Sequence, residues 1–197
     1  MVPVLDNSQY AICLRLIREL NQKGCWCGTT HIQQIAYVMQ ALFADRPVWE
    51  FVLYKHGPRS FTLDTVLESL FQMGCVKYGL LSPLKCRIQL TKEGELFYKT
   101  FEHLSEEYAA AIEKTAGILS AHSIQALENF STVVFYSTLY RRQSDTPILA
   151  QKLRDIKPFL ALPDAEKIVS ECKGVLDNLK GIISGNGNTA RMHVCLA

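Results

Sequence analysis

Residues 53–60, LYKHGPRS, place cationic side chains around a Gly-Pro pair. Lys55, His56 and Arg59 come just before a helix that the sequence predicts to start near Thr62. In helix-turn-helix proteins that bind DNA, backbone amides and cations at such a turn position the phosphates. The segment therefore predicts contact with a phosphate or an acidic partner. The alternative is that the Gly-Pro pair only turns the chain, while the charges are solvated.

The helix predicted after this turn is poorly suited to reading bases. It carries Asp64 and Glu68 but no lysine or arginine, whereas readout in the major groove depends mainly on Arg, Lys, Asn or Gln. Its carboxylates would face a duplex with one negative charge per about 1.7 Å. Duplex DNA and a cognate protein both stay open as partners. Candidate contact residues in the turn, the helix and the following hairpin are Lys55, His56, Arg59, Ser60, Thr62, Thr65, Lys77, Lys85 and Arg87.

The segment GCWCGTTH raises the question of a metal site. Cys25, Cys27 and His31 supply three potential ligands within seven residues. Structural zinc normally takes four ligands, often from two C-x2-C pairs, and no second pair is evident here. A short strand or turn with a cysteine packed inward is the preferred interpretation, so no metal is predicted. A metal-binding or cysteine-dependent enzyme that uses these residues is a remote alternative.

The remaining sequence favours no catalytic class. It has no G-x-S-x-G, no Walker-type phosphate loop and no H-E-x-x-H, so neither an enzyme nor a cofactor is predicted. The net charge of +2 over 197 residues argues against a chain-wide nucleic-acid or membrane surface. No apolar run is long enough to span a bilayer. Seven cysteines without an export signal predict reduced thiols in a cytoplasmic protein.

The hydrophobic pattern predicts a mostly α fold of the α+β class, a winged helix-turn-helix with a small antiparallel sheet. Two helices, near 8–22 and after Thr29–Thr30, precede a strand through Trp49, Phe51 and Leu53. A third helix, a hairpin around Ser82–Pro83 and a helix opened by Thr91 follow. We expect this winged-helix domain to cover residues 1–102.

The second half predicts a C-terminal helical segment over 103–183, followed by a flexible Gly/Asn-rich tail over 184–197. The stretch FSTVVFYSTLY is apolar on more than one face, which is typical of a helix buried in its own core or against a second copy. A homodimer through these helices is therefore an alternative to burial within the chain.

The order of several short motifs resembles that of YwgA-like winged-helix proteins of prokaryotes. IQQIAY (32–37) is similar to their L-Q-K-Φ-x-Y motif, where Φ is an apolar residue, and LYKHGPRS is similar to their Y-G-P-x-S turn. Leu90–Thr91 with Gly94, and IKPF (156–159), match later motifs. The Panacea (SocA-like) antitoxin domain is a more distant resemblance. The resemblance implies a non-enzymatic binding module in transcription regulation or antitoxin biology. Gln34 departs from it, because the motif has lysine there.

Overall fold

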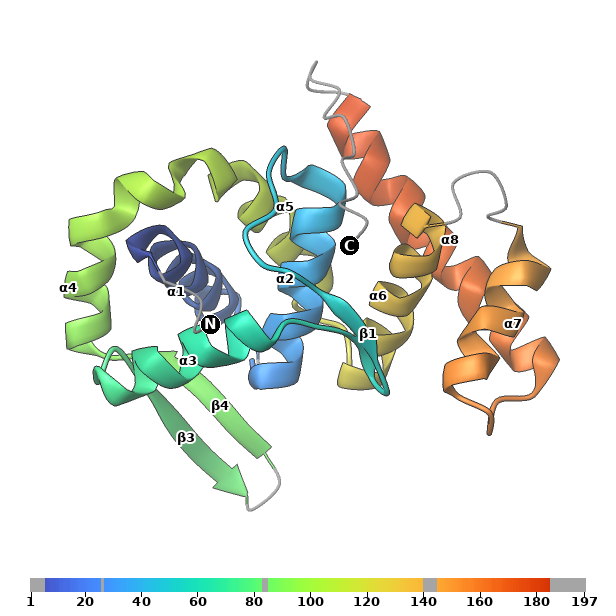
Figure 1. Ribbon diagram of the computed structural model, residues 1–197, viewed down its shortest axis with the longest axis horizontal. Coiled ribbons are helices and arrows are strands. Elements are labelled where there is room, and N and C mark those ends of the chain that lie inside the picture. Colours follow the sequence, from blue (N-terminus) through green and yellow to red (C-terminus); the bar gives the residue numbers. More distant parts are fainter. Residues whose placement is uncertain (1–5, 26, 83–84, 140–144, 185–197) are drawn as a thin grey trace.

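The computed structural model describes residues 6–25, 27–82, 85–139 and 145–184, with no side-chain description at 80–82, 85–86, 180 and 182–184. The protein is mostly helical, with two small two-stranded antiparallel sheets (Figure 1). In chain order the elements are α1 Asn7–Gln22, α2 Thr29–Phe43, β1 Val52–Tyr54, β2 Gly57–Arg59, α3 Phe61–Gln72, β3 Val76–Ser82, β4 Lys85–Leu90, α4 Lys92–Phe101, the 3-10 helix Glu102–Tyr108, α5 Ala109–Leu119, α6 Ile124–Leu139, α7 Thr146–Ile156 and α8 Leu162–Ser184.

Side-chain caps fix the starts of three of these helices. Asp6 accepts hydrogen bonds from the backbone of α1, with the Ser8 amide at 2.8 Å. Ser60 caps α3 and Thr91 caps α4 in the same way. Each cap satisfies an amide that has no partner inside its helix. The predicted starts of the first and third helices, and the opening of the next one by Thr91, are therefore confirmed.

The sequence predicted a single strand through Trp49, Phe51 and Leu53, whereas in the structure β1 begins at Val52 and pairs with a second strand, β2, that was not predicted. Gly57 pairs with Tyr54 in β2, so Lys55 and His56 form the turn and the Gly-Pro pair belongs to a strand. Gly57 has a φ of 112°, which favours glycine, and this conformation carries the chain close against α2 and α6. The expected Gly-Pro turn is therefore wrong by two residues.

The second hairpin agrees with the prediction. β3 and β4 pair antiparallel from Val76↔Leu90 outward, and Figure 1 shows them projecting from the body beside α3. Its tip, 83–84, and the predicted flexible tail from 185 onward lie outside the described residues.

α2 lies at the centre of the hydrophobic core. Residues 31–39 are all buried, and the helix contacts α1, α3, α5 and α6. One cluster of buried residues extends from α1 to α8. α6 packs on α2, α7 and α8, which buries Leu127, Phe130, Val133 and Val134, while Ile124 and Leu139 at its ends stay exposed. The homodimer and the domain limits stay predictions, and α4 continues directly into the 3-10 helix at residue 102.

Among the helices of the described residues, none combines the length and the apolar character needed to cross a membrane.

Candidate partner-binding face

Two adjacent glutamines of α2 hold the β1–β2 hairpin and the start of α3. Gln33 accepts from the Ser60 amide at 2.9 Å and donates to the Ser60 carbonyl, also at 2.9 Å. Its amide group also donates to Asp64 at 2.9 Å. Gln34 donates to the Pro58 carbonyl at 3.3 Å. Both glutamines are 3% exposed, so these bonds form in a setting shielded from water.

Gly57 is packed where no larger residue fits. A Cβ atom there would lie 2.9 Å from Gln34 Oε1 and 3.2 Å from the hydroxyl oxygens of Ser131 and Thr132. The Ser131 hydroxyl donates to Gln34 Oε1. The motif residues of α2 and of the hairpin therefore meet the middle of α6, which anchors β2 against this C-terminal helix.

Arg59 is held between two aromatic rings and a carboxylate. Its guanidinium carbon lies 5.8 Å from the ring centroids of both Tyr54 and Phe61. Its Nε donates to Asp64 Oδ2 at 2.8 Å. Cation–π contacts and an ion pair thus fix this side chain at the surface. Asp64, which the sequence presented as an obstacle to DNA, is the partner that neutralises this cation.

Val52, the two aromatic rings and the Arg59 side chain between them form one exposed surface, which we call the β1–α3 patch and define as Val52, Tyr54, Arg59 and Phe61. Val52 is 49% exposed, Tyr54 is 44% exposed and Phe61 is 60% exposed. Val52 and Arg59 are directly opposite in the β1–β2 register, so their side chains leave the same face of the ribbon. The patch is therefore one surface built by the hairpin and the first turn of α3.

His56 joins a second polar cluster on the other side of the turn. Its Nδ1 lies 3.7 Å from Glu128 Oε1. The other carboxylate oxygen of Glu128 lies 3.4 Å from Lys157 Nζ, which also donates to Asn129 Oδ1 at 2.6 Å. Lys157 is only 5% exposed. The cluster connects the hairpin, α6 and the link between α7 and α8.

The other candidates in the turn and in α3 have different surroundings. Ser60 is fully buried, so this candidate contact residue is wrong as a surface contact; its hydroxyl caps α3. The exposed Thr65 hydroxyl donates to the Phe61 carbonyl at 3.0 Å. Lys55 is exposed at the turn and Thr62 is half-buried.

Of the three basic residues predicted on the second hairpin, two lie on the same face of the β3–β4 ribbon. Lys77 is exposed and Arg87 is half-buried. The register pairs Gly79 with Arg87, so Lys77 and Arg87 lie on one face of the ribbon. The Lys85 backbone begins β4, but its side chain lies outside the description.

The candidate metal ligands Cys25, Cys27 and His31 all lie within the described residues. In the described part of the chain, no group of three or more His, Cys, Asp or Glu residues is placed to hold a metal ion. Burial raises the pKa of Cys27 to about 12, with Arg87 acting in the opposite direction, and it also raises the pKa of Cys25. Protonated thiols are poor ligands and nucleophiles. The Cys27 carbonyl instead accepts from the Ile88 amide at 2.8 Å, joining this segment to β4.

Sequence reasoning missed the two aromatic residues of the β1–α3 patch and the two charged partners of the cluster around His56. Tyr54 and Phe61 flank the turn that drew attention through its charges, and their β-strand and helix-start positions were the available signal. Glu128 and Lys157 lie far from the turn in sequence, and only the fold brings them to His56.

Comparison of the sequence with models of protein families and with curated proteins gave no match. The resemblance to YwgA-like proteins and to the Panacea domain therefore stays a prediction.

Proposed function

We propose that this protein is a non-enzymatic winged-helix module that docks a cognate protein through the β1–α3 patch. The winged-helix part of the proposal is supported by the order of α1, α2, α3 and the β3–β4 hairpin. It is also supported by the hydrogen bond from Ile88 to Cys27, which attaches the segment between the first two helices to the edge of the hairpin.

The observation that carries the docking proposal is the state of Arg59. The cation best placed for a DNA phosphate is already paired with Asp64 and covered by Tyr54 and Phe61. Its surroundings are two exposed aromatic rings and an exposed valine. Tyr and Arg are enriched among the residues that contribute most to protein–protein binding, and rigid aromatic rings lose little entropy on association.

Photo-crosslinking from this patch tests the proposal. A photoreactive phenylalanine analogue at position 61 should capture in cells the same protein as one at position 54. One at Phe159, which is 76% exposed and lies outside the patch, should not capture it. After identification and purification of the captured protein, Phe61→Ser should weaken its binding at least about tenfold in calorimetry, the effect of losing one central aromatic contact. Unchanged affinity would overturn the proposal.

Duplex DNA is the second candidate, favoured by Lys77 and Arg87 on one face of the projecting β3–β4 hairpin and by the exposed Lys55. Fluorescence anisotropy with a labelled random duplex at two salt concentrations separates the two candidates. Phosphate contacts predict affinity that falls steeply with salt and a shallower slope in Lys55→Ala and Lys77→Ala. The docking proposal predicts no such binding at physiological salt.

A further inference from the structure

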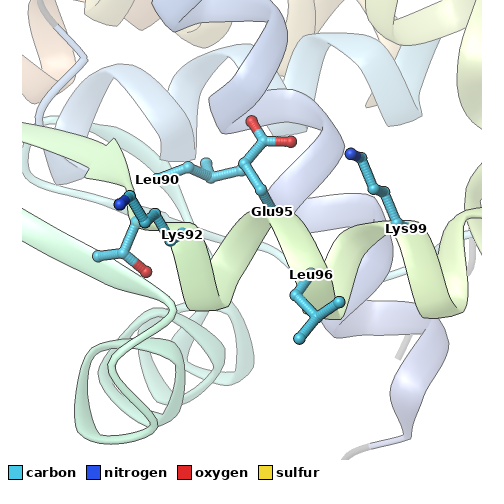
Figure 2. A pocket seen from close by; sticks show the side chains of 6 residues that line it. Leu90, Lys92, Glu95, Leu96 and Lys99 are labelled. Carbon is cyan, nitrogen blue, oxygen red and sulfur yellow. The ribbon is translucent and has the colours of Figure 1, made fainter.

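The groove beside α4 does not specify the charge of a ligand. It has a volume of about 490 Å³ and is lined by Leu90, Thr91, Lys92, Glu95, Leu96 and Lys99. Figure 2 shows Glu95 and Lys99 on one side of α4 and Leu96 on the opposite side. Because a carboxylate lies between the two lysines along the helix, the groove favours neither an acidic nor a basic partner. The backbone edge of β1 carries more information.

The register of the first hairpin leaves the outer edge of β1 unpaired. Pro58 has no N–H group, so Leu53 and Pro58 form a pair without mutual hydrogen bonds. The ladder bonds therefore belong to the pairs on either side, which Val52 and Tyr54 form with β2. As a result, the amide and the carbonyl of Leu53 point away from β2.

The two edges of the hairpin have different surroundings. On β2, the outward carbonyl of Pro58 accepts a hydrogen bond from Gln34 at 3.3 Å, and this strand packs on α2 and α6. β1, in contrast, has its main contact with β2. Among the described residues, none donates to or accepts from the backbone of Leu53. β1 is therefore an open edge strand, and such an edge is a template for pairing with another chain.

We propose that β1 pairs with an extended segment of the partner protein, which adds an antiparallel strand to the hairpin. This inference rests on the proposed docking function and specifies the form of the partner. An antiparallel segment exchanges two hydrogen bonds with Leu53 through the single residue opposite it. The neighbours of that residue would lie beside the exposed side chains of Val52 and Tyr54, so the segment carries apolar residues at i and i+2.

An extended peptide tests the edge directly. The probe is a capped peptide of alternating threonine and valine, and binding is followed by amide chemical shifts of the full-length protein. At about 1 mM peptide, where even a weak complex is populated, we expect the largest shift and slower hydrogen exchange at the Leu53 amide. The matched control is the same peptide with N-methyl groups on its threonines. It cannot donate to the Leu53 carbonyl, so its binding should be at least about fivefold weaker.

Two variants of one residue separate the backbone from the side chain. Leu53→Pro removes the outward amide hydrogen but no ladder bond, and proline is tolerated on the outer side of an edge strand. It should weaken binding of the peptide, and of the protein captured by photo-crosslinking, at least about tenfold. Leu53→Ala keeps the amide and should weaken both by less than about threefold. Unchanged exchange protection of the Val52 and Tyr54 amides verifies that each variant keeps the hairpin.

Four results would overturn strand addition. They are equal weakening by Leu53→Pro and Leu53→Ala, equal binding of the plain and N-methylated peptides, shifts confined to another surface, and no change at Leu53 with either the peptide or the captured protein. Light scattering adds a further outcome. A dimer of this chain that Leu53→Pro abolishes would assign the edge to a second copy and would overturn the partner proposal.

Phe61→Ser distinguishes a failure of this inference from a failure of the docking proposal. If the captured protein binds Phe61→Ser weakly but Leu53→Pro normally, the β1–α3 patch stays the docking surface and strand addition is overturned. If the peptide protects the Leu53 amide while Phe61→Ser binds the captured protein normally, the edge stays a strand acceptor and the patch is overturned as the docking surface.

Discussion

Position 57 requires glycine for two reasons: its backbone has a positive φ, and there is no room for a Cβ atom. A side chain there would adopt an unfavourable φ of 112°, and its Cβ would lie 2.9 Å from Gln34 Oε1. Gly57→Ala is expected to lower the free energy of unfolding by about 1–3 kcal/mol, the range for a strained backbone position. Denaturant titration followed by circular dichroism measures this change.

Gly174 provides the matched control for that substitution. It lies within α8, and a Cβ added there meets nothing within 4 Å. Gly174→Ala should therefore raise stability by about 0.5–1 kcal/mol through helix propensity. Similar behaviour of the two variants would contradict the packing assigned to Gly57.

His31 makes stability depend on pH. Burial lowers the pKa of its imidazole below the ordinary value of 6.5, and the His122 backbone offsets this only in part. As the pH falls below about 6.5, the unfolded chain binds a proton that the folded chain resists, so the free energy of unfolding decreases until the folded pKa is reached. Above pH 6.5 this contribution is constant.

Urea titrations at pH 7.5 and 5.5 test the effect, with His31→Leu as the variant. Because other titrating groups are common to both proteins, the stability loss between the two pH values should be smaller in the variant than in the wild type. An equal loss in both proteins would show that His31 takes up its proton in the folded state as easily as in the unfolded one.

At the scale of elements, Gln33 links α2 to α3. Gln33→Leu would leave the amide and the carbonyl of the fully buried Ser60 without this partner. The Ser60 carbonyl keeps the Asp64 amide as a donor at 3.1 Å, so only the Ser60 amide loses its described partner. We expect a loss of about 1–3 kcal/mol, the cost of an unsatisfied buried polar group. Thermal or urea unfolding measures it. The exposed Gln72→Leu should change stability by less than about 0.5 kcal/mol, and a comparable loss there would remove the case for a specific role of Gln33.

The elements themselves were largely predictable from local signals. The opening of α4 by Thr91 and the apolar period of the helices gave their limits to within a few residues, whereas Ser60 was predicted as a contact residue and is the cap of α3. The β1–β2 turn was misplaced because Gly-Pro is a strong local turn signal, whereas the fold uses Gly57 for its lack of a Cβ.

The candidate site was less predictable, because its contacts join residues that are distant in sequence. Helical periodicity recognised the apolar stripe of α2 but gave no reason for Gln33 and Gln34 to be buried. Their partners are backbone groups of the hairpin and the Ser131 hydroxyl. Similarly, the charge of Arg59 was evident from the sequence, while its neutralisation by Asp64 depends on the geometry of the first turn of α3.

At the scale of the whole molecule, Glu128 and Lys157 couple the hairpin to the C-terminal helices. Glu128→Ala removes the carboxylate beside an ammonium that is 5% exposed and leaves Asn129 as its remaining described partner. We expect a loss of about 3–5 kcal/mol, because an uncompensated buried charge is costly.

A double variant separates the cost of leaving Lys157 without its carboxylate from the contribution of the Glu128–Lys157 ion pair to stability. Glu128→Ala with Lys157→Met replaces the buried cation by an apolar side chain of similar length, so stability should recover by at least about 1 kcal/mol relative to Glu128→Ala alone. A double-mutant cycle in urea measures the coupling. A strictly additive loss would mean that Lys157 reaches water once Glu128 is gone.

The central position of α2 also has a consequence for synthesis. The ribosome makes this helix before α5 and α6, whose side chains complete its surroundings. A nascent chain that ends before residue 109 therefore carries the buried run 31–39 without its final cover. Translation has to continue through α6 before α2 can reach its native surroundings. Until then the N-terminal half exposes apolar surface of the kind that chaperones bind during synthesis.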